Sequence, residues 1–271
     1  MPAITLPPSV LRVGRPRRLG LWTRVAFAVF MVTGVLSLFG AAMTLAATYD
    51  EDQYIAAGFF AQTLLPYQDF IYLQAPLYVF VLAGLFKLSG GWFMLTGRLL
   101  TSCFSFASAA LLWRLLRRLG AGQVLAMVLL LACLTSPFLA SPLSNARNDA
   151  LPLALMLAGL LLHLGAGGRF WRQAAAALLF GLAVEAKVSY LFGSAALGVH
   201  ALFALRERLP PVVLGTLAAA LPAVLCYAAA PEAFRFAVLD FHLVATPDWY
   251  VQQGAGASLT VPVRLRSLLG W

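Results

Sequence analysis

Long apolar runs alternate with short charged clusters along almost the whole chain. About 20 apolar residues in a helix are enough to cross the hydrocarbon core of a bilayer, and the first run, 25–48, has no charged side chain. Helices are expected because hydrocarbon offers backbone groups no water to bond, and the runs lack strand-like alternation. We therefore predict an all-α, polytopic transmembrane helix bundle in one integral membrane domain, 1–271. Its seven predicted spans are 25–48, 93–113, 123–140, 150–168, 173–186, 188–205 and 211–230.

The composition excludes an ordinary soluble domain, because 62% of the residues are hydrophobic and only 11% are charged, against about 25% charged residues in soluble proteins. A net charge of +9 does not indicate nucleic-acid binding, since the basic residues form short clusters between apolar runs, where membrane orientation explains them. The three cysteines lie within apolar runs without paired spacing, which favours packing over disulfides or metal binding.

The distribution of charge predicts the orientation. Arginines at 12, 15, 17, 18 and 24 precede the first span, so the N-terminus is expected in the cytoplasm. Counting the spans alternately then puts every acid except Glu207 on the opposite, extracytoplasmic side. Residues 173–205 are short for two crossings, so they form either a thin hairpin or one span with an interfacial segment. Arginine pairs at both ends favour the hairpin, and the arginine- and alanine-rich composition indicates a bacterial inner membrane.

Two outer loops are expected, at 50–92 and 231–260, and both are rich in aromatic residues, which favour the membrane interface. Within the first loop, 55–65 and 77–88 are each too short to span a bilayer. We predict that they form helices lying along the membrane surface. An outer face that combines interfacial helices with carboxylates indicates a site that meets a lipid head group.

The acidic triplet Asp50-Glu51-Asp52 directly follows the first apolar run. After it come Tyr54, the stretch Leu65-Pro-Tyr-Gln-Asp-Phe70 and the stretch Ala75-Pro-Leu-Tyr78. This loop resembles the first extracytoplasmic loop of the protein O-mannosyltransferase and aminoarabinose-transferase superfamily. These are membrane glycosyltransferases, and the resemblance implies their GT-C-like fold.

Further stretches extend the resemblance from about residue 25 to residue 205. They are Gly97-Arg-Leu-Leu100, Arg114-Leu-Leu-Arg-Arg-Leu-Gly120, Ala146-Arg-Asn-Asp149 and Gly181-Leu-Ala-(x)3-Lys187. The resemblance implies an inverting transfer of a sugar from a polyprenyl phosphate to a glycan, lipid or protein acceptor on the extracytoplasmic face. Family members are usually longer, and Leu268-Leu-Gly-Trp271 opens another apolar run, so we expect this chain to be the N-terminal part of a transferase.

Such a reaction needs a carboxylate to remove the acceptor proton and cations to stabilise the leaving phosphate. The resemblance implies Asp50 as the base, with Glu51 beside it and Asp149 as the second acidic position. The alternative is that these acids only cap the helices that follow them. Cations expected at the donor phosphate are Lys187, Arg147, Lys87 and Arg98. Alternatively, Lys187 snorkels or pairs with Glu185, Arg147 neutralises Asp149, and the other two anchor the chain at the interface.

No cofactor is expected, and the lack of a glycine-rich nucleotide loop disfavours a nucleotide-sugar donor. A divalent metal stays open, although the spacing of Asp240, His242 and Asp248 is a weak metal signal. One alternative function is a transporter or flippase of a lipid-linked or polar solute. A transporter is expected to carry ionisable residues near the middle of the membrane and often an internal repeat, which favours the enzyme here. The other alternative is a non-catalytic fragment of the transferase.

Overall fold

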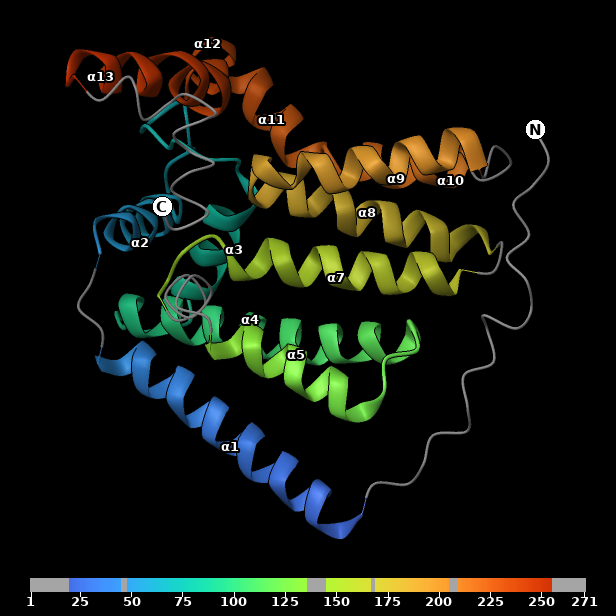
Figure 1. Ribbon diagram of the computed structural model, residues 1–271. Helices are drawn as coiled ribbons and strands as arrows, with labels where there is room; N and C mark the ends of the chain where they lie inside the picture. The colour runs from blue at the N-terminus through green and yellow to red at the C-terminus, as the bar shows by residue number, and fades with distance from the viewer. Residues whose placement is uncertain (1–19, 45–47, 136–144, 167–168, 205–208, 255–271) are drawn as a thin grey trace.

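The computed structural model describes residues 20–44, 48–135, 145–166, 169–204 and 209–254 (Figure 1). These residues form helices and no named strand, which confirms the all-α prediction. The N-terminal helices are α1 (Leu21–Thr44), α2 (Tyr49–Phe60), α3 (Leu77–Phe86), α4 (Phe93–Arg118) and α5 (Gln123–Thr135). The helices that follow are α7 (Ala150–Gly165), α8 (Phe170–Ala186), η1 (Val188–Tyr190), α9 (Leu191–Ala204), α10 (Leu209–Ala219), α11 (Leu221–Ala229), α12 (Pro231–Arg235), η3 (Phe236–Ala245) and α13 (Thr246–Gln252).

Two of these helices are long and apolar enough to cross a membrane, namely α1 over Val25–Thr44 and the 26-residue α4. Helices α10 and α11 make a third candidate if they count as one span bent by 44°. Each of the seven expected runs overlaps a helix, but the others are shorter than these candidates. The end of the run 123–140 lies outside the described residues. Membrane crossing is thus indicated for two or three helices, and seven spans remain a prediction.

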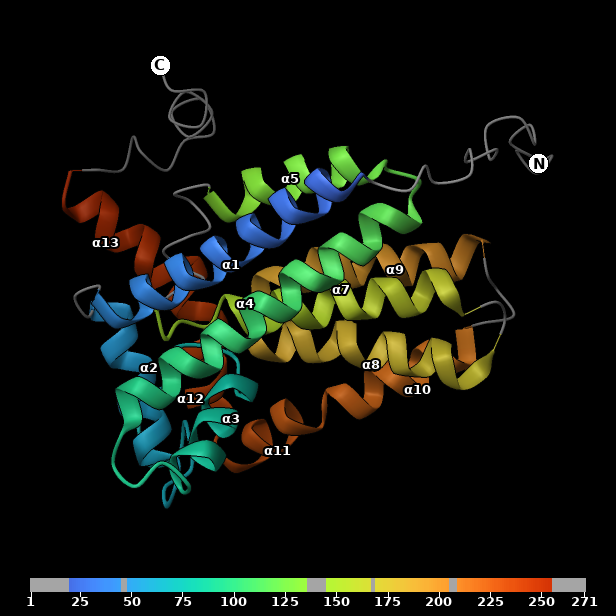
Figure 2. The same ribbon diagram turned by 90° about the horizontal axis from the view of Figure 1, so that it is seen from below.

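Helices α4, α7, α8, α9 and α10 lie roughly side by side, with α2 and α3 at one end (Figures 1 and 2). Helices α8 and α9 run in opposite directions and form a helical hairpin (Figure 1), whereas the prediction that both cross a membrane stays a prediction. Ser194 Oγ on α9 donates a 2.9 Å hydrogen bond to the carbonyl oxygen of Phe180 on α8. The turn between them lies at the same end as α2 and α3 (Figure 1).

The C-terminal helices return to this end of the molecule. His242 Nε2 on η3 lies 2.7 Å from the carbonyl oxygen of Leu73, and the rings of Phe234 and Tyr67 are 4.9 Å apart. Helices α12 and η3 thus lie beside the first loop, whereas the side of the membrane on which both lie stays a prediction.

Large apolar side chains are exposed on several of the long helices. Phe192 and Phe203 on α9 are 84% and 85% exposed, and Leu36 on α1 and Leu217 on α10 are largely exposed as well. Extensive exposed apolar surface marks a membrane or protein contact. This distribution agrees with a chain whose outer faces contact lipid.

The first loop differs from the sequence expectation in one helix boundary. Helix α2 begins at Tyr49 and ends at Phe60, so the prediction of a helix over 55–65 placed it too far along the chain. The Thr48 hydroxyl accepts a 3.3 Å hydrogen bond from the Glu51 backbone N–H, which caps the helix. Three carboxylates in the first turn are also favoured by the helix dipole. The acidic triplet is therefore part of the helix.

Helix α3 is more buried than a helix lying on a membrane surface. Tyr78, Val79, Leu82, Ala83 and Phe86 are buried, and α3 contacts α2, α4 and α8. Because this helix is apolar on all sides, it can bury one face in the core. It anchors the first loop to the helices that carry the site.

Candidate functional site

Glu51 and Arg98 form a buried bidentate ion pair between α2 and α4. Arg98 Nε donates to Glu51 Oε1 at 2.8 Å, and Arg98 Nη2 donates to Oε2 at 2.7 Å. The backbone N–H of Ala146 donates to Glu51 Oε1 at 2.7 Å. Arg98 Nη1 donates to the carbonyl oxygen of Ala42, at 2.7 Å, near the end of α1. This pair therefore joins α1, α2, α4 and the segment before α7.

The pair is saturated and hidden from solvent, since Glu51 is 0% and Arg98 is 7% exposed. Burial raises the pKa of Glu51, but hydrogen bonds from Arg98 and the Ala146 backbone, with the Arg98 charge, hold that pKa below its usual range. Both groups are thus ionised and fully engaged with each other. This geometry argues against Glu51 as a catalytic group and against Arg98 as a donor-phosphate ligand, and gives both a positioning role.

Four other residues form a connected row of ion pairs at the same end of the molecule. Arg147 Nη2 lies 3.0 Å from Asp50 Oδ2, and Arg147 Nε lies 3.2 Å from Asp149 Oδ2. Asp149 Oδ1 also contacts Lys187 Nζ. The Asp50 side chain is 50% exposed, whereas the other three are between one fifth and one third exposed. We call Asp50, Arg147, Asp149 and Lys187 the ion-pair row.

The local backbone explains how the row assembles. Asp149 is the residue before α7, yet its side chain makes no capping hydrogen bond, so the alternative in which it only caps this helix is wrong. Lys187 ends α8 in an extended conformation, with φ −148° and ψ 117°. The buried side chain of Asn148 donates from Nδ2 to the carbonyl oxygen of Ala186. Asp149 follows Asn148 in the chain, and Lys187 follows Ala186. The hydrogen bond between Asn148 and Ala186 therefore brings Asp149 and Lys187 close together.

Sequence reasoning missed two of these relationships. No role was predicted for Asn148, although an amide side chain between Arg147 and Asp149 can donate a hydrogen bond that positions its neighbours. Glu185 was considered as the partner of Lys187, but Lys187 pairs with Asp149, and Glu185 lines a cavity between α8, α9 and α10. Glu185 lies on α8, whereas Lys187 follows the end of this helix in an extended conformation, so the two side chains do not pair.

Gly97 allows the elements that carry the row to approach one another. A Cβ atom at this position would lie 2.6 Å from Ile55 Cδ1 on α2 and 2.9 Å from the Ala146 Cβ atom. Both distances are shorter than real contacts of a Cβ atom. A glycine here therefore sets the spacing between α2, α4 and the segment that contains Arg147.

A cluster of tyrosines lies next to the row. Tyr54 on α2 is buried, with its ring centroid 5.5 Å from that of Tyr78 and 6.5 Å from that of Tyr72. Burial raises the pKa of the Tyr54 hydroxyl, and the charges of Asp149 and Asp50 raise it further. Tyr54 therefore stays protonated, and its side chain is an uncharged neighbour of the ion-pair row.

The remaining candidates lie apart from the row. Lys87 is exposed at the end of α3, and no bond to the row is found for it in the described part of the chain. Asp69 accepts a 2.7 Å hydrogen bond from the Leu65 backbone N–H, which stabilises the turn in the first loop. Asp240 pairs with Arg235 at 3.2 Å. Within the described ranges, no three His, Cys, Asp or Glu side chains gather as metal ligands would.

The chain was compared with models of protein families, with curated proteins and with solved structures. None of the three comparisons found a match. The family resemblance therefore remains a prediction that rests on the motifs and their spacing.

Proposed function

We propose that this chain acts in membrane glycosyl transfer, moving a sugar from a polyprenyl phosphate to an acceptor hydroxyl on the extracytoplasmic face of a bacterial inner membrane. The observation that carries this proposal is the ion-pair row. It puts a half-exposed carboxylate and two cations in one network. The row lies at the N-terminal end of α4, which is long and apolar enough to cross a membrane.

Asp50 is the base in this proposal. It takes the proton of the acceptor hydroxyl as the acceptor oxygen attacks the anomeric carbon of the sugar. The bond between that carbon and the donor phosphate oxygen breaks, and its electron pair leaves with the polyprenyl phosphate. Attack opposite the leaving group inverts the anomeric configuration. Asp50 is favoured over Glu51 because Glu51 is fully buried and paired, whereas the Asp50 side chain is 50% exposed.

Lys187 and Arg147 bind the donor phosphate. In the free protein both contact Asp149, so Asp149 positions the cations for the incoming anion. Because the leaving group gains negative charge during transfer, cations aimed at it stabilise the transition state more than the ground state. Glu51 and Arg98 act from behind, by fixing α2 against α4 and the Ala146 segment.

A transport function is a second candidate, and Glu185 is the observation that favours it. This carboxylate is only 9% exposed and lines a cavity of about 320 Å³ between α8, α9 and α10. An ionisable residue among apolar helices often marks a pathway for solute or ions. Solute uptake into proteoliposomes that is lost in Glu185→Gln and retained in Lys187→Met would favour transport over transfer.

Donor binding tests the proposed enzyme through its two lysines. The purified chain in nanodiscs would be titrated with a fluorescent polyprenyl phosphate. Lys187→Met keeps much of the side-chain bulk and removes the charge, and should weaken binding about tenfold or more, as expected for a charge-assisted hydrogen bond. Lys87→Met is the matched control, because Lys87 is the other of the two lysines and is exposed away from the row. Equal affinity of the two variants and the wild type would overturn the role of Lys187.

A further inference from the structure

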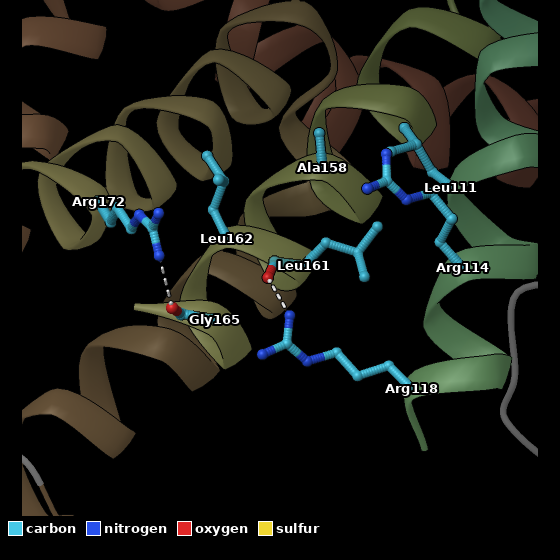
Figure 3. Close-up of a pocket in the computed structure, with 8 residues that line it drawn as sticks. All are labelled: Leu111, Arg114, Arg118, Ala158, Leu161, Leu162, Gly165 and Arg172. Atoms are coloured by element: carbon cyan, nitrogen blue, oxygen red, sulfur yellow. Dashed lines mark hydrogen bonds between the residues drawn. The ribbon is translucent and has the colours of Figure 1, made fainter. Parts of the chain in front are cut away.

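A cavity lined by three arginines lies at the opposite end of α4 from the ion-pair row. Its volume is about 600 Å³, and Arg114 and Arg118 from α4, Arg172 from α8 and the C-terminal turns of α7 line it (Figure 3). The 16 residues from Arg98 to Arg114 correspond to about 24 Å along a helix axis. This distance approaches the thickness of a bilayer core, so the two sites lie near opposite membrane faces if α4 crosses the membrane.

Two of the three arginines are held in place by the end of α7. Arg118 donates from Nη1 to the carbonyl oxygen of Leu161 at 3.3 Å and from Nη2 to that of Leu164 at 2.8 Å. Arg172 donates from Nη1 to the carbonyl oxygen of Gly165 at 3.3 Å. The last four carbonyls of a helix lack intrahelical partners, which explains the hydrogen bonds to Leu164 and Gly165. The remaining donors of both guanidinium groups stay available.

Arg114 differs from these two arginines. No hydrogen bond or ion pair to it is found within the described ranges, and it is exposed. The cavity lining contains no acidic residue, and its other members are Leu111, Ala158, Leu161, Leu162 and Gly165. Three guanidinium groups therefore share one concave space without a carboxylate in its lining. A general excess of arginine at a cytoplasmic face explains their presence but not their convergence on one cavity.

We propose that this cavity binds the phosphate group of an anionic membrane lipid. Guanidinium groups match phosphate oxygens in geometry and charge, and basic pockets between membrane helices bind acidic head groups. The leucine side chains of the lining offer an apolar path for the adjoining acyl chain. The same chemistry would accept free phosphate, so the test must separate the two sources. This site does not depend on the proposed transferase activity.

The test is lipid binding by the detergent-purified chain, measured by native mass spectrometry. The probes are phosphatidylglycerol, phosphatidylcholine and, separately, inorganic phosphate. Arg114→Gln removes a charge from the cavity without removing a contact to α7, and should weaken phosphatidylglycerol binding about tenfold or more. The matched control is Arg117→Gln, at the same helix end, because Arg117 donates to the carbonyl oxygen of Ala121 at 2.6 Å and does not line the cavity. This control should change binding by about twofold or less, because Arg117 lies outside the cavity lining.

Selective binding of phosphatidylglycerol that depends on Arg114, without binding of inorganic phosphate, supports a lipid site. Binding of inorganic phosphate with the same dependence on Arg114 supports the phosphate site and assigns it to free phosphate. Equal losses in the Arg114 and Arg117 variants would mean diffuse surface attraction and would overturn the proposal. Unchanged binding in Arg114→Gln, or equal binding of the two lipids, would overturn it as well.

Discussion

Asp50 Oδ2 lies 3.0 Å from Arg147 Nη2, so an ion pair joins the first turn of α2 to the segment before α7. The neighbouring residue, Glu51, points into the core and binds Arg98 and the Ala146 backbone. Adjacent residues on a helix face different directions, which allows one carboxylate to position the segment and the other to remain accessible. The buried Glu51–Arg98 pair thus fixes the position of the more exposed Asp50–Arg147 pair.

Removing the Glu51 charge should destabilise the fold strongly. Glu51→Gln leaves the buried Arg98 guanidinium without its counter-ion, a loss that typically costs about 3–5 kcal/mol in the free energy of unfolding. The matched control is Asp52→Asn in the same helical turn, which is exposed and should cost about 0.3–1 kcal/mol through the helix dipole. Denaturant unfolding in detergent measures both variants. Similar losses in the two would contradict a structural role for the Glu51–Arg98 pair.

The contribution of Glu51 to stability should depend on pH in one direction. Its pKa in the folded chain lies below its ordinary value of 4.5, so the ionised form favours the folded state. The difference in unfolding free energy between the wild type and Glu51→Gln should be complete above that ordinary value. It should shrink as the pH falls through the lower pKa of the folded state. Thermal unfolding of both proteins across this range checks it, and a difference that vanished already near neutral pH would contradict the assignment.

Gly97→Ala should disturb the site through packing. The added methyl group would clash with Ile55 Cδ1 and the Ala146 Cβ atom, and overpacking of this kind costs about 1–3 kcal/mol. Gly84→Ala on α3 is the control, since a Cβ atom there meets nothing within 4 Å and alanine favours a helix by about 0.5–1 kcal/mol over glycine. The free energies of unfolding of the two variants should therefore change in opposite directions. A neutral Gly97→Ala would show that the close approach is not needed.

Labelling of introduced cysteines tests the orientation. In a background without the three native cysteines, Cys at Gln68 and at Gln252 should react with an impermeant thiol reagent added outside intact cells. A Cys at Leu119, at the opposite end of α4, should not react. All three positions are exposed, so burial does not confound the result. Labelling at Gln68 but not at Gln252 would mean that α8 and α9 do not cross the membrane as a hairpin.

Much of the helical arrangement was predictable because apolar runs persist over whole helices. The start of α2 was not, since its first turn carries Asp50, Glu51 and Asp52, which interrupt the apolar pattern. The Thr48 cap and the helix dipole outweigh that interruption. The burial of α3 could not be derived from its length alone, because a short apolar helix suits both the membrane surface and a core.

For the site, the motifs identified the chemical groups but not their pairing. Asp50, Arg147, Asp149 and Lys187 were all expected to act, and the structure places them in one row. The Glu51–Arg98 pair was not foreseen, because contacts between residues 47 positions apart depend on how helices pack. A pair between Lys187 and Glu185 was considered as an alternative to phosphate contact, whereas Lys187 pairs with Asp149, which the Asn148 bond to Ala186 brings close.

The most direct test of the central claim is the rate of sugar transfer by Asp50→Asn compared with Asp52→Asn. Proteoliposomes that contain each variant would receive polyprenyl phosphates carrying radiolabelled hexose or pentose, with an extract of acceptor glycans and lipids. If Asp50 is the base, Asp50→Asn should slow transfer about a hundredfold to ten-thousandfold while binding of polyprenyl phosphate stays close to wild type. Asp52→Asn should transfer at nearly the wild-type rate. Equal rates for wild type, Asp50→Asn and Asp52→Asn, or no transfer by the wild-type chain, would contradict the account.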